Sequence, residues 1–152
     1  MKEKQIWLDE KDQAILEELR KDSRSTTTQI AKKTRIPRVT VHERIRKLKK
    51  GGVIKLFTVA PDYAKLGRPS TAFILIAYAQ GPVSQRELAR KISLLPGVHE
   101  VHAVTGEWDF LLKARGASLQ EIGELVVDKL RALPGVARTQ TIACFSTIKE
   151  EL

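Results

Sequence analysis

Hydrophobic residues recur at helical spacing in the first third of the chain and divide it into three short segments. Asp9 precedes an apolar stripe and is followed by acidic residues, which predicts a helix over residues 10–21. The Ser and Thr cluster at 25–28 predicts the start of a second helix, which Pro37 must end. A third helix is expected over residues 38–50, because two glycines follow it.

The segment after the third helix alternates between apolar and polar residues. Residues 53–59 are rich in β-branched side chains and end before Pro61, which predicts a strand. Three helices and a strand within about sixty residues are typical of a helix-turn-helix unit of the winged-helix-like kind. We therefore predict a helix-turn-helix domain over residues 1–52, followed by a hinge strand and linker over residues 53–68.

The second half of the chain has a different pattern, in which strands and helices follow one another. The run TAFILIAYA is apolar on both faces of a strand, so each face needs a cover. Two later helical stretches both end in Leu-Pro-Gly-Val, which marks two similar helix-to-strand corners. The predicted elements are strands at 71–79, 98–105, 109–114 and 138–148, and helices at 84–94 and 119–132.

This βαββαβ order predicts a ferredoxin-like domain with a four-stranded antiparallel sheet over residues 69–152. Right-handed crossovers place both helices on one face of the sheet and leave the other face bare. Since the first strand is apolar on both faces, the simplest cover for the bare face is the same sheet of a second chain. The whole chain is therefore predicted to be an α+β protein that dimerises through its sheet.

The charge of the chain is distributed unevenly. The formal net charge at pH 7 is +9. Residues 1–68 contain 18 Lys or Arg and 9 Asp or Glu, whereas residues 69–152 contain 9 of each. A surface that binds a polyanion concentrates one sign of charge in one module. This distribution favours a basic N-terminal module joined to a neutral C-terminal one.

The third predicted helix offers a basic surface for DNA. Val41, Ile45 and Leu48 would form its buried seam. A helix that follows a short helix and a tight turn can enter the major groove, although a solvated charged helix is the alternative interpretation. With the charge distribution included, we predict that the chain binds double-stranded DNA. The candidate contacts are Thr27, Arg38, Val39, Thr40, His42, Glu43, Arg46, Lys47 and Lys50.

The sequence VTGEWDF at 104–110 is a predicted hairpin turn with an unusual composition. Gly106 can supply the backbone angle that such a turn requires, and an ordinary turn is one interpretation. Trp108, however, is a costly residue to expose, and Glu107 and Asp109 beside it can bind an ammonium or guanidinium group. The turn is therefore a candidate site for a small ligand.

Several classes of protein are disfavoured by what the sequence lacks. Because it has no long apolar run and begins with polar and charged residues, we expect a cytoplasmic protein without a membrane span. The one cysteine, Cys144, excludes an internal disulfide and a multi-cysteine zinc site. His99 and His102 would face opposite sides of a strand, so no metal is expected there. No catalytic constellation stands out, and we expect neither an enzyme nor a cofactor.

Several stretches occur together in an order that covers nearly the whole chain. They are LDEKDQAILEELRKDSRSTTTQIAKKT, VTVHERIRKLKKGGVIK, TGEWD and the two Leu-Pro-Gly-Val corners. With them the chain resembles the leucine-responsive and asparagine-regulator (Lrp/AsnC) family of transcriptional regulators. The absence of Asn, a thermolabile residue, agrees with an archaeal or thermophilic member.

The resemblance implies a fold and two kinds of ligand. It implies an N-terminal helix-turn-helix, a strand hinge and a C-terminal βαββαβ domain that binds a small effector, usually an amino acid. It also implies that dimers assemble into tetramers or octamers, with the turn at Gly106 and the last strand near the effector pocket. The candidate effector contacts are Thr105, Gly106, Glu107, Trp108, Asp109, Thr139 and Thr141.

Two positions before the third helix depart from the family pattern. Arg35 stands where the family commonly has a glycine, and we expect it to adopt a backbone angle that favours glycine. Pro37 stands where the family commonly has a capping Ser, and it can begin a helix but cannot cap it with a hydroxyl.

Two functions are consistent with these patterns. The first is a sequence-specific transcriptional regulator whose assembly or DNA binding responds to a small effector. The second is an architectural protein that binds DNA largely without sequence preference, because the Lys-rich second half of the third helix could serve phosphates alone.

Overall fold

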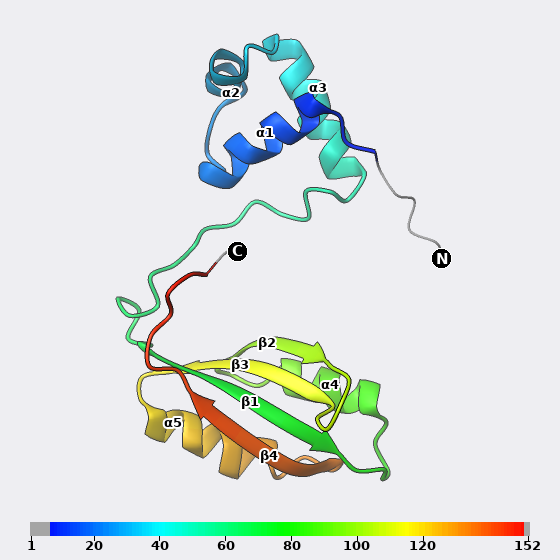
Figure 1. Cartoon of the computed structure of the whole chain (residues 1–152), viewed down its shortest axis with the longest axis vertical. Helices are drawn as coiled ribbons and strands as arrows, with labels where there is room; N and C mark the ends of the chain where they lie inside the picture. Colours follow the sequence, from blue (N-terminus) through cyan, green and yellow to red (C-terminus); the bar gives the residue numbers. More distant parts are fainter. Residues whose placement is uncertain (1–6, 151–152) are drawn as a thin grey trace. The chain divides into compact units, whose positions relative to one another are not determined.

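The computed structural model describes residues 7–150 and divides into two compact units (Figure 1). The first is Met1–Ala60 and the second is Pro61–Leu152. Each unit has its own apolar core, and each is described by itself. None of the helices in the described part of the chain is long and apolar enough to cross a membrane.

The first unit consists of three helices around a small core. They are α1 (Glu10–Lys21), α2 (Thr27–Thr34) and α3 (Arg38–Lys50), so the three predicted helices are confirmed. The core collects apolar side chains from all three helices and from the segment that follows them. Its buried members are Ile15, Leu19, Ile30, Ile36, Val41, Leu48 and Ile54.

Side-chain caps determine where α1 and α2 begin. Asp9 accepts a hydrogen bond from the backbone N–H of Asp12 at 2.9 Å, and Asp12 accepts one in return from the backbone N–H of Asp9. Thr26 and Gln29 form the same reciprocal box before α2. α2 ends at Thr34, and the residue after it, Arg35, has a φ of 58° in the left-handed region, as its position predicted.

The linker after α3 differs from the prediction. Residues 53–60, all of which the structure describes, form no strand, so the predicted hinge strand at 53–59 is wrong for this chain. Ile54 joins the core, but Leu56 and Val59 are exposed. The alternating pattern needs a neighbouring strand to accept its backbone hydrogen bonds, and no described segment pairs with it.

The second unit is a four-stranded antiparallel sheet with two helical segments. The strand order is β2-β3-β1-β4, which confirms the predicted ferredoxin-like βαββαβ arrangement. The second helical segment begins as an α-helix and continues as a π-helical turn, η1. The elements are β1 (Ser70–Tyr78), α4 (Gln85–Ser93), β2 (Val98–Ala103), β3 (Phe110–Gly116), α5 (Leu119–Glu124), η1 (Leu125–Leu130) and β4 (Val136–Ala143).

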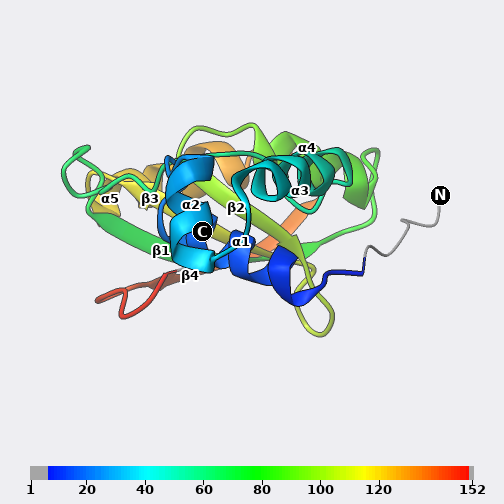
Figure 2. The same ribbon diagram turned by 90° about the horizontal axis from the view of Figure 1, so that it is seen from above.

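Both helical segments cover the same face of the sheet, as predicted (Figures 1 and 2). Ile74 and Ile76 of β1 and Leu112 of β3 are fully buried in the core on this face. Leu88 of α4 and Ile122 of α5 pack against them. Alternate residues of each strand point to the opposite, helix-free face.

No helix covers the second face, as predicted, but the chain's own tail reaches one end of it. β4 ends at Ala143 rather than near residue 148, and the Cys144 N–H donates to the Thr71 carbonyl at 3.0 Å where the chain leaves the sheet. The following segment brings Glu150 to Lys113, so the chain's own tail covers part of this face. The pattern of residues 144–148 resembles that of a strand, so the prediction extended β4 too far. Sequence alternation does not reveal where strand pairing stops.

Candidate functional site

The exposed side of α3 is positioned by its buried side. Val41 is fully buried and Leu48 is 2 % exposed, while Ile45 packs at the edge of the core, so the predicted seam is confirmed. The seam leaves the rest of the helix circumference facing away from the core. Val39 is 75 % exposed in the first turn, and the later turns present basic side chains.

A groove of about 750 Å³ runs beside α3 and gathers most of the predicted DNA contacts. Arg38 and His42 are exposed on α3 outside this groove, and Thr27 lies at the first position of α2. The predicted residues that line the groove are Val39, Thr40, Glu43, Arg46, Lys47 and Lys50.

Arg44 also lines this groove but has a structural partner. Its Nη1 lies 2.8 Å from a carboxylate oxygen of Asp9 and 2.8 Å from one of Asp12, whose side chain is almost fully buried. The backbone N–H of Asp12 lowers the pKa of Asp9, and Arg44 lowers it further. Arg44 therefore ties α3 to the beginning of α1. Sequence patterns did not identify this role, because the partners lie 35 and 32 positions away.

Arg46 is held much more loosely. Its Nη2 lies 2.9 Å from the Glu43 carboxylate one turn earlier, and both side chains are more than half exposed. An exposed pair of this kind contributes little to stability and exchanges readily with another anion. Arg46 is thus available to a DNA base or phosphate, whereas Arg44 is committed to the fold.

In the second unit, the predicted turn connects β2 to β3. The Val104 N–H donates to the Asp109 carbonyl at 2.9 Å and closes the hairpin. Gly106 has a φ of 116°, which a side chain would disfavour, so its predicted role in the turn is confirmed. Thr105 and Glu107 on either side of it are exposed.

Asp109 anchors this turn to the rest of the unit. One carboxylate oxygen accepts a hydrogen bond from the Tyr78 N–H at 2.7 Å, and the other accepts one from the Gln85 side chain at 3.0 Å. Both oxygens therefore have donors from the chain itself. The geometry gives Asp109 a positioning role, in which it holds the turn against the end of β1 and the start of α4.

Trp108 lies in a small polar cluster that the sequence did not reveal. The Arg138 guanidinium is stacked 4.3 Å from the centre of the indole ring, and its Nη2 lies 2.6 Å from the Glu107 carboxylate. Stacking on a cation explains how a half-buried tryptophan is stabilised at a turn. Arg138 was missed because a contact between a turn and a distant strand has no local sequence signal.

Thr139 and Thr141 lie away from this cluster. They pair with Ile76 and Ile74 and therefore point to the helix-covered side of the sheet. Thr139 accepts a hydrogen bond from Arg131 at 2.9 Å. Within one chain, the described structure thus brings Glu107 and Trp108 together with Arg138, but not with the two threonines.

A three-helix unit with an exposed basic helix, joined to a βαββαβ unit, defines a two-part DNA-binding protein. Residues 8–55 match the family described as winged helix-turn-helix DNA-binding. Residues 71–152 match the Lrp/AsnC ligand binding domain. The chain belongs to the Lrp/AsnC family of transcriptional regulators, which confirms the resemblance seen in its sequence.

Whole-length relatives agree with this assignment. An uncharacterized HTH-type transcriptional regulator of Pyrococcus furiosus is 48% identical over 95% of this chain and 97% of its own length. The HTH-type transcriptional regulator FL11 of Pyrococcus horikoshii is 37% identical over 95% of this chain and 94% of its own length. A Neisseria meningitidis regulator, solved in complex with L-Met, has the same fold with a TM-score of 0.90 at 23% identity, covering 95% of this chain and 94% of its own.

Proposed function

We propose that this regulator binds specific DNA sites through α3 and that a small effector, an amino acid, bound to the second unit alters its assembly or its DNA binding. The observation that carries the proposal is the groove along α3, where hydrogen-bonding and basic side chains of the first unit lie together. The net positive charge of the chain belongs to residues 1–68, which includes this unit. No catalytic role is part of the proposal, and the expected location is the cytoplasm, where the DNA is.

On DNA, the two halves of α3 have different tasks. Thr40, Glu43 and Arg46 lie where they can meet base edges, and an arginine reads guanine through O6 and N7. Lys47 and Lys50 follow on the same groove and suit phosphates. Arg44 is excluded from this set because Asp9 and Asp12 hold it.

The proposed effector site is the turn at Gly106 with Arg138. An amino acid presents an ammonium and a carboxylate, and Glu107 and Arg138 provide one charge of each sign beside Trp108. An effector would replace this exposed ion pair: its ammonium group would pair with Glu107 and its carboxylate with Arg138. The L-Met complex of the Neisseria regulator supports the class of ligand. Thr139 and Thr141, which face the other side of β4, would join the site only from another chain.

We further propose that two copies pair through the helix-free faces of their sheets. Phe73 and Leu75 of β1 point to this face and are only partly buried, and Ile142 of β4 is 45 % exposed. A second sheet would remove this apolar surface from water. Such a dimer presents two copies of α3, as paired DNA half-sites require, and dimers would assemble further into tetramers or octamers.

The experiment is a footprint of the purified protein on the DNA upstream of its own gene, with and without a mixture of the twenty amino acids. The expected result is protected patches about one helical turn apart that change when the mixture is added. Uniform, salt-sensitive protection that ignores DNA sequence would instead support the architectural alternative. Sequence-specific protection that does not change when the mixture is added would support the DNA-binding half of the proposal and contradict the effector half.

A further inference from the structure

Two cations on the helix-free face are buried to an extent that is unusual for such side chains. Lys113 and Arg115 alternate with core residues on β3, and they are 9 % and 8 % exposed. A buried cation is tolerated only when an anion and hydrogen-bond acceptors replace its water. Each of these two cations must therefore have a partner within the fold.

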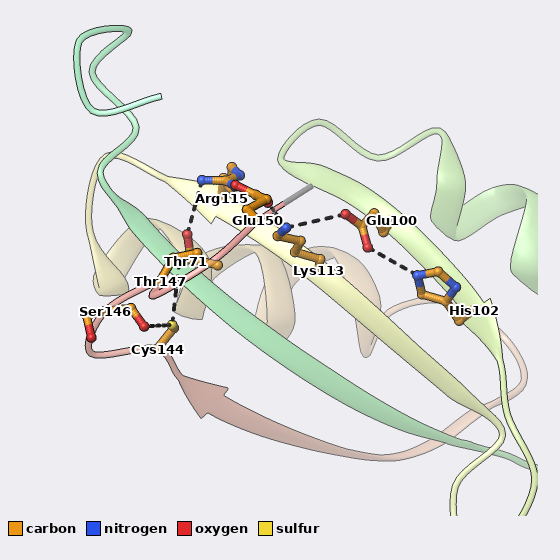
Figure 3. Close-up of polar contacts among 9 residues, drawn as sticks. All are labelled: Thr71, Glu100, His102, Lys113, Arg115, Cys144, Ser146, Thr147 and Glu150. Carbon is orange, nitrogen blue, oxygen red and sulfur yellow. Dashed lines mark hydrogen bonds and ion pairs between the residues drawn. The ribbon is translucent and has the colours of Figure 1, made fainter. Parts of the chain in front are cut away.

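The shared partner is one carboxylate (Figure 3). Nη2 of Arg115 lies 2.7 Å from Oε1 and 2.6 Å from Oε2 of Glu150, and the Lys113 ammonium contacts Oε1 of the same group. Lys113 also lies 3.4 Å from Glu100. One carboxylate thus receives donors from two side chains, as a bound ligand does in an anion site.

Further groups fix the orientation of Arg115. Its Nη1 donates to the Thr71 hydroxyl at 3.3 Å. Its guanidinium is stacked 4.1 Å from the centre of the Tyr63 ring, which in turn meets His99 edge-on. Because β3 has neighbours on both sides, the backbone that carries the two cations is held firmly in the sheet.

The carboxylate is attached quite differently. Glu150 lies in the segment beyond the last paired residue of β4, Ala143, and its side chain is 32 % exposed. Phe145 and Ile148 on the way to it are almost completely exposed and contribute no packing to its position. The receiving groups belong to the sheet, whereas the group they receive belongs to a segment outside it.

We propose that Lys113 and Arg115 form a carboxylate-binding site, which the chain fills with its own Glu150 and which a small free carboxylate can fill instead. The charges favour a single negative charge, since the two cations then balance Glu100 and the ligand. The site lies toward the end of β3 remote from the turn at Gly106. It is separate from the proposed effector site and does not depend on that proposal.

The test compares propionate, which matches the end of a glutamate side chain, with its neutral isostere propionamide. Glu150→Gln removes the charge of the internal ligand with little change in shape. The matched control is Glu87→Gln, which removes an exposed acid from α4 on the other face of the sheet. Each protein is titrated at constant ionic strength, and binding is followed by the backbone amide NMR shifts of residues 113 and 115 and by the thermal midpoint.

In Glu150→Gln we expect a lower thermal midpoint, which propionate raises in a saturable manner and propionamide does not. The wild type and Glu87→Gln should need at least about tenfold more propionate, because a tethered carboxylate competes at high effective concentration. A second substitution, Arg115→Gln, should abolish the response.

Three outcomes would overturn the proposal. The first is a lack of any saturable response to propionate in Glu150→Gln. The second is equal propionate affinity in Glu150→Gln and wild type, because Glu150 would then not occupy the site. The third is a set of NMR shifts centred away from residues 113 and 115, which decides the question even if Arg115→Gln does not fold.

Discussion

Apart from Arg44, the cations of α3 are exposed to water, whereas Lys113 and Arg115 of β3 are buried and share a carboxylate. Arg46 is 73 % exposed with one loose partner, and Arg115 is 8 % exposed with a carboxylate, a hydroxyl and an aromatic ring around it. An exposed cation can pair with a polyanion at little cost, but a buried cation has already lost its water and needs an anion in contact with it. An arginine is therefore exposed and loosely paired at one position and buried with fixed partners at the other.

The largest losses of stability should come from substitutions that truncate a side chain in one core and leave the other core intact. Leu48→Ala in the first unit and Leu112→Ala in the second each remove a buried side chain, and each should lower the free energy of unfolding of its own unit by about 2–5 kcal/mol. The two core clusters share no residue, so each substitution should leave the other unit's hydrogen-exchange protection unchanged. Loss of protection in both units from either substitution would show that they unfold as one.

Two arginines on α3 allow the same comparison within one helix, because Arg44 is held by carboxylates and Arg46 is exposed. Arg44→Met leaves Asp12 buried without its cation, and we expect the free energy of unfolding to fall by about 1–3 kcal/mol. Arg46→Met removes an exposed pair and should change it by less than about 0.5 kcal/mol. Urea unfolding measures both. A larger loss of stability from Arg46→Met would contradict the assignment of structural and DNA-facing roles.

Substitution of Arg46 should weaken DNA binding even though it should hardly change the stability of the first unit. Arg46→Met should weaken binding to the operator by about 1–3 kcal/mol, measured by titration at fixed salt. Lys129→Met, which removes one exposed charge from the second unit, should have little effect and serves as the control. Equal losses from both would mean that net charge, rather than the surface of α3, determines affinity.

Glu107→Gln should leave DNA affinity intact and weaken effector binding by about tenfold, since it removes a charged acceptor from the turn. Trp7→Phe removes the other tryptophan, so the fluorescence of Trp108 alone then reports binding. The amino acids can be titrated singly. If none of them changes the fluorescence, the turn at Gly106 is a structural feature without an effector.

The smallest effect concerns pH. Burial lowers the pKa of His99 below its ordinary value of 6.5, and Arg115 and Arg68 lower it further. The fold thus favours the neutral form of His99. The resulting contribution to the free energy of unfolding is complete above pH 6.5 and is lost as the pH falls below that value. In the first unit, hydrogen bonds and nearby cations lower the pKa values of Asp9 and Glu18 from 3.8 and 4.5, so their contributions are lost only at lower pH.

The second unit should therefore begin to lose stability at a higher pH than the first. Denaturation midpoints of the two units, measured between pH 7.5 and 5, test this order. His99→Gln should make the second unit less sensitive to pH over this range, while His102→Gln provides a comparison on the same strand. An unchanged pH profile in His99→Gln would remove His99 from the explanation.

Local patterns predicted the regular elements well, because their causes are local. Asp9 and Thr26 begin α1 and α2 through partners only three residues away. The helix seam and the βαββαβ order likewise follow from spacing along the chain. The strand expected at 53–59 did not form, because a strand depends on a neighbour that the pattern cannot supply.

The candidate sites were predicted less completely, because they depend on contacts between distant residues. Most of the residues predicted to contact DNA line one groove beside α3, because they are close in sequence, and their contact with DNA stays a prediction. Arg44, Arg138 and Glu150 were missed in their actual roles, since each acts through a partner more than thirty positions away. Asp109 was predicted beside a ligand, but its hydrogen bonds to Tyr78 and Gln85 also make it a support of the turn.

The turn before α3 combines backbone strain with a positive charge at one residue, Arg35. Arg35 adopts a left-handed backbone with φ 58° and ψ 26°, which costs a residue with a side chain about 1 kcal/mol or more. A glycine would relieve this strain but would also remove a cation at the entrance to the basic helix. An Arg35→Gly substitution should therefore make the unit more stable and less basic, so the backbone strain and the positive charge are lost together.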